Sequence, residues 1–166
     1  MTFEEIKNLL TEKFGESLIP EANEEAIQPY LVIETDKIGD VCQELHDNEN
    51  TYFDFLSCLT GLDNGVEAGT MEVIYHLYSI PYDHRLVLKV ILPRNKEGEV
   101  LPKVPSVSSV WRTADWHERE AFDLFGIEFL DHPDLRRILL PADWEGYPLR
   151  KDYKHQDLYH GIQVEY

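Results

Sequence analysis

The chain has 166 residues and a formal net charge of −17, with 32 Asp and Glu against 15 Lys and Arg. This length suits one ordinary domain with a single core. The charge argues against nucleic acid, whose phosphates such a surface would repel, and against direct adsorption to an anionic membrane. The start MTFEEIKNLL lacks the positive charge of a signal peptide, and no apolar run reaches transmembrane length, so we expect a cytoplasmic chain.

The first elements alternate between helix and strand patterns. Thr2 and Glu5 match a capping box ahead of apolar residues at helical spacing, which predicts a helix from Phe3 to Phe14. Residues 16–26 are acidic and typical of a loop. Tyr30 to Glu34 is a short β-rich run that predicts a strand. Asp36 then offers an N-cap for a second helix that reaches about His46.

Three further runs predict the centre of a sheet. Tyr52 to Leu59, Met71 to Ile80 and Arg85 to Leu92 read as strands, and residues 63–65 read as a turn. Prolines at 93, 102 and 105 predict a closing loop, followed by a helical turn at 106–111. The fold class is therefore α+β: a single twisted, mainly antiparallel, four-stranded sheet packed with helices. Cys42 and Cys58 lie in patterns typical of a core, without the CxxC spacing of a metal site.

The stretch from Trp111 to Tyr153 contains all three tryptophans and dense charge of both signs. Thr113 as cap and Gly126 as C-terminal glycine predict a helix over 113–125. Within it, Arg119 and Asp123 are four residues apart and close enough to pair.

The prolines and the composition of residues 127–166 predict an extended C-terminal docking tail. Prolines at 133, 141 and 148 exclude a long helix. Arginine and aromatic residues, the types enriched in interface cores, recur through this irregular segment. We therefore expect a compact body at 1–126, including the helix before Gly126, and a docking tail at 127–166, within one domain overall. We also expect Asp134 or Glu120 to pair with Arg136 or Arg137.

One fragment superficially resembles a zinc-protease motif. His117-Glu118 begins like HExxH, but Ala121 stands where the second histidine would be needed. His117, Glu118 and Glu120 could supply acid and base groups, which leaves a stand-alone acidic enzyme as an alternative. Ion pairing on the helix is the simpler interpretation, because no phosphate loop or nucleophile motif accompanies them. We expect no catalytic, cofactor-binding or metal-binding residue.

Glu118-Arg119-Glu120, Asp123, His132 and Arg136, followed by Ile138-Leu139, form a recognisable pattern that continues through DWEGYPLRKDY. The pattern resembles the C subunit (30 kDa subunit family) of bacterial respiratory complex I, the NADH:quinone oxidoreductase, homologous to the mitochondrial iron-sulfur protein 3 subunit. The resemblance implies a compact α+β fold and a non-catalytic subunit of the hydrophilic arm, with no activity when isolated. FMN, iron-sulfur clusters, NADH and quinone would be bound by other subunits of this proton- or sodium-translocating complex.

The resemblance also implies partners and a location. The chain would pack beside the D (49 kDa type) subunit, which helps form the quinone pocket, and near iron-sulfur subunits. It would be a peripheral protein on the cytoplasmic side of the bacterial inner membrane, held there through its partners. The candidate interface and ion-pair residues are Trp116, Glu118, Arg119, Glu120, Asp123, His132, Asp134, Arg136, Arg137, Trp144, Arg150, Lys151, Asp152 and Tyr153.

Three alternatives remain beside this interpretation. The nearest is the corresponding subunit of a membrane-bound hydrogenase or of a ferredoxin- or deazaflavin-dependent relative of complex I. The second is the stand-alone enzyme described above. The third is a soluble adaptor that binds a basic protein through its acidic N-terminal half.

Overall fold

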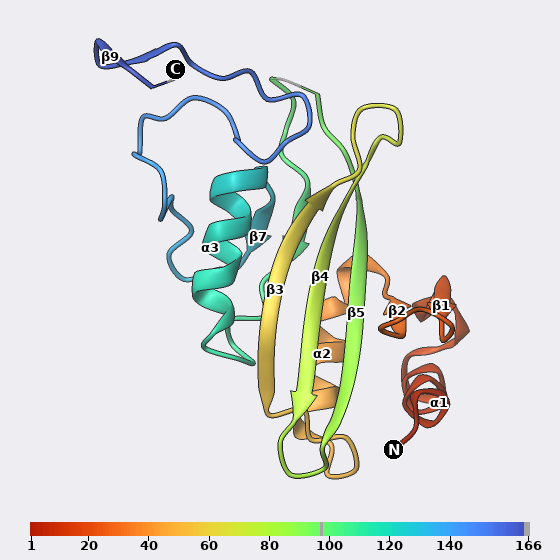
Figure 1. The fold of residues 1–166 in the computed structure, drawn as a ribbon. Helices are drawn as coiled ribbons and strands as arrows, with labels where there is room; N and C mark the ends of the chain where they lie inside the picture. Colours follow the sequence, from red (N-terminus) through yellow and green to blue (C-terminus); the bar gives the residue numbers. More distant parts are fainter. Residues whose placement is uncertain (97, 165–166) are drawn as a thin grey trace.

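The computed structural model describes residues 1–96 and 98–164 (Figure 1). Its helices are α1 (Phe3–Phe14), α2 (Ile38–Asp47) and α3 (Ala114–Phe125), with short 3-10 turns η1 (Glu16–Leu18) and η2 (Thr35–Lys37). Its strands are β1 (Glu21–Asn23), β2 (Tyr30–Val32), β3 (Phe55–Asp63), β4 (Thr70–Ser79), β5 (His84–Pro93), β6 (Lys103–Pro105), β7 (Glu128–Leu130), β8 (Leu158–Tyr159) and β9 (Ile162–Gln163).

The main sheet has five strands among the described residues, in the order β1-β2-β5-β4-β3, where the sequence predicted four. The predicted antiparallel trio β3, β4 and β5 is confirmed, and β2 is the fourth strand, paired parallel to β5. The missed strand β1 pairs antiparallel with β2 inside the segment 16–26, which we expected to be a loop. Its three residues lie at the sheet edge with no alternation of apolar and polar side chains, so its sequence carries no strand signal.

Several boundaries differ from those predicted. Strand β3 begins at Phe55 rather than Tyr52, because Tyr52 belongs to the turn after α2, with a φ of 37° and an N–H that donates to Asn48 O. Asp36 lies in η2 and does not cap α2. The expected proline-rich loop contains β6, which pairs parallel with β7.

The three predicted helices are present, but the cap of α3, like that of α2, differs from the one predicted. Helix α1 forms with its capping box, in which Thr2 Oγ1 accepts the Glu5 N–H and Glu5 Oε2 accepts the Thr2 N–H. Helix α3 ends at Gly126 in the left-handed conformation, with a φ of 68°. Thr113 occupies the N-cap position, but its hydroxyl donates to Leu56 O of the neighbouring strand instead of capping the helix.

The core lies on one side of the three long strands, where α2 covers the sheet (Figure 1). Cys42 of α2 is fully buried there, but Cys58 is exposed, so the prediction of two core cysteines was wrong for Cys58. The reason is a register shift in β3: Leu56 faces Leu77 and Cys58 faces His76, with one residue between them left out of the ladder. A bulge of this kind moves the following residues to the opposite face.

Helix α3 packs along β3 at a position without a side chain. Gly61 of β3 is buried, and a Cβ on it would lie 2.7 Å from Phe125 Cδ2 and 3.3 Å from Ile127 Cδ1. After β7 the chain passes α3 on the side away from the sheet and ends in the hairpin of β8 and β9 (Figure 1). The division into a body and a tail at residue 126 stays a prediction, although β7 is joined to the body through β6.

Because of this close approach, Gly61→Ala should lower the free energy of unfolding by about 1–3 kcal/mol, the usual cost of overpacking. The matched control is Gly39→Ala in α2, where a Cβ meets only Pro105 Cβ at 3.9 Å. That change should leave stability equal or raise it, since alanine is the better helix former. Urea unfolding of both variants checks the pair, and equal stabilities would contradict the packing argument.

Candidate protein interface along helix α3

The buried carboxylate of Asp123 organises the chain beside α3. Its side chain has no exposed surface, and Oδ2 accepts the N–H groups of Ile138, Leu139 and Leu140 at 3.0, 2.8 and 2.9 Å. Burial alone would raise the pKa of Asp123, but these donors and the Arg137 guanidinium outweigh it and hold the pKa below its ordinary value. Asp123 therefore fixes three successive residues of the returning chain.

Arg137 extends the same connection in two directions. Its Nη1 donates to Asp123 Oδ1 at 2.7 Å and to Asp123 O at 3.0 Å. Its Nη2 donates to Trp144 O at 3.1 Å and to Gly146 O at 2.9 Å. The Arg137 guanidinium thus joins α3 to the backbone at two points of the segment 138–146, which belongs to no strand and makes no sheet hydrogen bonds.

Tyr147 lies between two arginines against the end of α3. Its ring centroid is 5.3 Å from Arg137 Cζ and 4.9 Å from Arg150 Cζ, within the range of cation–π contacts. The ring packs so closely on Gly126 that a Cβ there would lie 2.5 Å from Tyr147 Cε2. Arg150 donates to Phe125 O and Gly126 O at 2.6 and 3.1 Å, which satisfies carbonyls at the helix C-terminus.

A second buried carboxylate, Asp63 at the end of β3, holds the segment that follows. It accepts two hydrogen bonds from Arg94 of the chain after β5, at 2.8 and 3.2 Å, and the N–H of Lys151 at 2.8 Å. Arg94 also pairs with Asp152. Burial would raise the pKa of Asp63, and the Arg94, Lys151 and Gly65 donors lower it below its ordinary value.

Glu118 lies on the inward face of α3 with no exposed side-chain surface. It accepts hydrogen bonds from Ser106 Oγ at 2.6 Å and Val107 N at 2.7 Å. Burial, only partly offset by these donors, raises the pKa of Glu118 from 4.5 to about 7. The side chain of His132, which also has no exposed surface, approaches Glu118 to 3.9 Å. Its Nδ1 accepts the Asp134 N–H, so Nε2 donates to Asp115 O at 3.1 Å.

The other predicted residues divide between the inside and the surface. Arg119 does not pair with Asp123, whose oxygens are taken by the returning chain; it donates to Arg136 O and Arg137 O and stacks over Trp116 at 5.3 Å. Arg136 forms an exposed pair with Asp134 at 2.8 Å. Trp144 Nε1 donates to the hydroxyl of Tyr153 at 3.0 Å, and Glu120 is exposed.

The contribution of Asp63 and Arg94 was missed by sequence analysis. They are 31 residues apart, and Asp63 stood in a turn pattern that explained it without a partner. The buried pairing of Glu118 with Ser106 and Val107 was also missed, because the sequence favoured an ion pair with a neighbour on the helix. In both cases the partner is distant in sequence and gives no local signal.

Large apolar side chains remain on the outside of this arrangement. Trp116 and Leu139 are each 61% exposed, and Leu149 is 52% exposed. Trp116 and Leu139 lie along the same side of α3, because Arg119 connects Trp116 to the backbone of Arg136 and Arg137, and Asp123, one turn further along this side, holds Leu139. An exposed tryptophan beside arginine and leucine is typical of a protein interface.

The three groups of the stand-alone enzyme hypothesis are not brought together. Glu118 points into the core, Glu120 is exposed on another face of α3, and His117 is half-buried between them. Among residues 1–96 and 98–164, no group of three or more His, Cys, Asp or Glu is placed to hold a metal ion. The arrangement around α3 therefore fixes an irregular segment and displays its surface.

The structure is thus a compact α+β fold with an ordered, irregular segment fixed against one helix. Within the described ranges, no helix is long and apolar enough to cross a membrane. The model of the family described as "Respiratory-chain NADH dehydrogenase, 30 Kd subunit" matches residues 31–159. The chain belongs to this family, as the resemblance of the 118–153 pattern implied.

Relatives support the same assignment. The chain is 42% identical over 160 residues to the C subunit of the NADH-quinone oxidoreductase of Chloroherpeton thalassium, and 42% identical over 160 residues to its namesake from Chlorobium phaeobacteroides. These matches cover 95% and 96% of the chain, and 63% and 93% of the two relatives. The chain thus spans less than two thirds of the first relative and nearly all of the second.

A solved structure shares the fold. A chain of the membrane-bound sulfane sulfur reductase, an archaeal respiratory membrane complex, superimposes with a TM-score of 0.71 and 24% sequence identity. The match covers 91% of this chain and 85% of that one. At this identity the likeness concerns the fold alone.

Arg137→Ala and Arg136→Ala make the same change at adjacent positions, but Arg137 pairs with a buried carboxylate and Arg136 with an exposed one. Arg137→Ala leaves the buried Asp123 carboxylate without its cation and should cost about 3–5 kcal/mol of stability. Arg136→Ala breaks a pair whose side chains are 71% and 52% exposed and should cost less than about 1 kcal/mol. Urea unfolding measures both, and similar losses would refute this distinction.

Glu118 should make stability fall as the pH rises. Because its pKa in the folded chain, about 7, exceeds the ordinary 4.5, the folded state binds the proton more tightly. The resulting stabilisation is fully present below pH 4.5 and is lost as the pH rises through about 7. At about 1.4 kcal/mol per pKa unit, the contribution is about 3 kcal/mol.

Urea unfolding at pH 5 and pH 8 measures this effect, with Glu118→Gln as the variant that cannot ionise. The wild-type chain should lose more stability between the two pH values than the variant does. Contributions from ionisable groups that the two proteins share cancel in the difference. Equal losses in the two proteins would contradict a raised pKa at Glu118.

Proposed function

We propose that the chain is a non-catalytic structural subunit of the hydrophilic arm of a proton-translocating NADH:quinone oxidoreductase. It holds no redox centre, packs beside the D subunit that helps form the quinone pocket, and lies on the cytoplasmic side of the membrane. Membership of the 30 kDa subunit family is the observation that carries this proposal. FMN, iron-sulfur clusters, NADH and quinone then belong to neighbouring subunits.

The docking element in this proposal is the surface formed by α3 and residues 127–153. Asp123, Arg137 and Asp63 hold the segment in one conformation against the body. A segment that is already ordered loses less conformational entropy on docking than a flexible one. Trp116, Leu139 and Arg136 on its outside are the side chains that a partner contacts first.

The assembly itself is tested by isolating the tagged chain from native membranes in mild detergent. The co-purifying proteins are identified by mass, and the eluate is assayed for NADH-dependent quinone reduction. Flavin and iron-sulfur subunits together with this activity are the expected result. Recovery of the chain without other subunits would refute the proposal. Nickel in the eluate, or reduction that depends on an electron donor other than NADH, would instead assign the chain to a hydrogenase-type relative.

The docking surface is tested by Trp116→Glu combined with Leu139→Glu. Placing carboxylates at an apolar contact should lower the amount of co-purifying subunits by at least about tenfold, the effect expected of an interface hot spot. Both side chains are exposed, so the unfolding free energy should change by less than about 1 kcal/mol. The control is Val66→Glu, 65% exposed in the loop between β3 and β4. Undiminished assembly of the double variant would refute the docking surface.

A further inference from the structure

The three long strands have a second face that no helix of the described chain covers. Figure 1 shows α2 behind β3, β4 and β5, and the opposite face free. Cross-strand pairing arranges this face, here called the open face, in four rows. The rows are Leu62–Glu72–Ile91, Thr60–Ile74–Lys89, Cys58–His76–Val87 and Phe55–Tyr78–Arg85.

The composition of the open face differs from that of a solvated sheet surface. A sheet with one face in water usually alternates apolar and polar side chains, so that the outer face is polar. Here Phe55, Leu62 and Ile91 are each 40–42% exposed, and Ile74 is partly exposed between them, whereas Val87 is buried. Exposed apolar side chains that recur in this way on one sheet face favour contact with another polypeptide.

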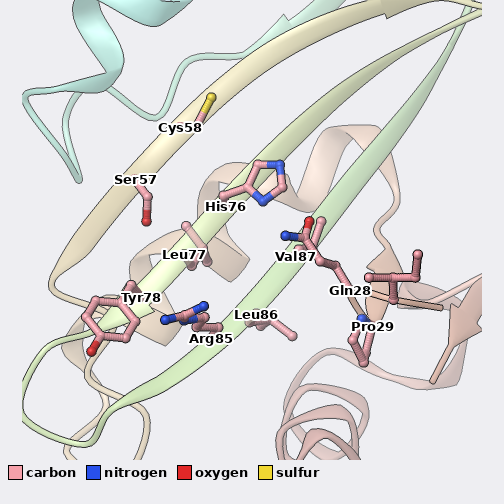
Figure 2. A pocket seen from close by; sticks show the side chains of 11 residues that line it. Gln28, Pro29, Ser57, Cys58, His76, Leu77, Tyr78, Arg85, Leu86 and Val87 are labelled. Carbon is pink, nitrogen blue, oxygen red and sulfur yellow. The ribbon is translucent and has the colours of Figure 1, made fainter. Parts of the chain in front are cut away.

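The surface is also hollowed. A cavity of about 620 Å³ lies over β3, β4 and β5, with Cys58, His76 and Arg85 among its lining residues and Gln28 and Pro29 at one side (Figure 2). Ile27 at this rim is fully exposed. The depression suits an inserted apolar side chain.

The open face carries charges of both signs. Within its rows, Glu72 pairs with Lys89 at 3.4 Å. Arg85 rests on the ring of Tyr78, at 5.6 Å from the centroid, and has no salt-bridge partner within the described ranges. At the rim, Asp83 accepts a hydrogen bond from the Tyr78 hydroxyl at 2.7 Å. Arg85 is therefore the charged side chain of the rows that remains available for a carboxylate of a partner.

We propose that the open face docks a segment of another subunit that presents apolar side chains and a carboxylate for Arg85. This proposal rests on the proposed function, because it takes the partner from the same complex, but it adds a second surface, on the outer face of the sheet, which borders α3 at Cys58 and Glu120. A second copy of the chain fits poorly, since it would bring Arg85 toward Arg85 and join two bodies of charge −17.

Cys58 provides a direct test. It is exposed on the open face, whereas Cys42 is fully buried, so a maleimide reports on a single native position. The labelling rate of Cys58 should be at least about tenfold lower in the complex isolated from membranes than in the purified chain. Rapid labelling in an intact complex would overturn the proposal while leaving the proposed function standing; failure to isolate any complex would instead refute the proposed function.

Charge reversal tests the chemistry of the partner. Arg85→Glu should restore the labelling of Cys58 in the complex, because it places a carboxylate against the partner's own. Lys37→Glu makes the same change on the exposed turn before α2 and should keep Cys58 protected. Equal protection of Cys58 from labelling in both variants would overturn the proposal of an acidic partner. Protection of Cys58 in the purified chain that rises with the chain's concentration would overturn it as well and indicate a second copy of the chain.

Discussion

The buried carboxylate of Asp123 is the constraint on which the second half of the molecule depends. A carboxylate without solvent contact is unfavourable unless hydrogen bonds replace its hydration. Here three successive backbone N–H groups and one guanidinium do so. The same hydrogen bonds satisfy donors of residues 138–140, which have no helix or strand partner. Helix and returning chain therefore require each other, and neither set of groups is satisfied without the other.

This reciprocity explains how a long irregular segment remains ordered. A structureless stretch of this length has no backbone ladder to oppose its conformational entropy. The chain uses side chains from the body instead: Asp123 and Arg137 hold residues 137–146, and Asp63 with Arg94 holds residues 151–152. Gly126 permits the close contact with Tyr147 between these two anchors. The anchors lie inside, which leaves tryptophan and leucine side chains outside.

Features with local causes could be predicted from the sequence, and features with distant causes could not. Alternation of apolar and polar residues predicted β4 and β5, and the capping box predicted α1, because each signal lies within one element. Strands β1 and β6 have three residues each and exist through pairing with chain elsewhere. The sequence paired Asp123 with Arg119, four residues away; the structure pairs it with residues 14 to 17 positions later, since only these offer several donors at once.

The exposure of Cys58 shows how one local irregularity changes the surface available for binding. A single residue left out of the β3 ladder turns Cys58 outward while Leu56 stays in the core. Without this shift, Leu56 before the irregularity and Leu59 after it could not both face the core. The sheet thus acquires an inner face that packs on α2 and an outer face with its own apolar rows. Because α3 sits at the edge of β3, it leaves that outer face open, and the chain can contact two neighbours without either contact disturbing the core.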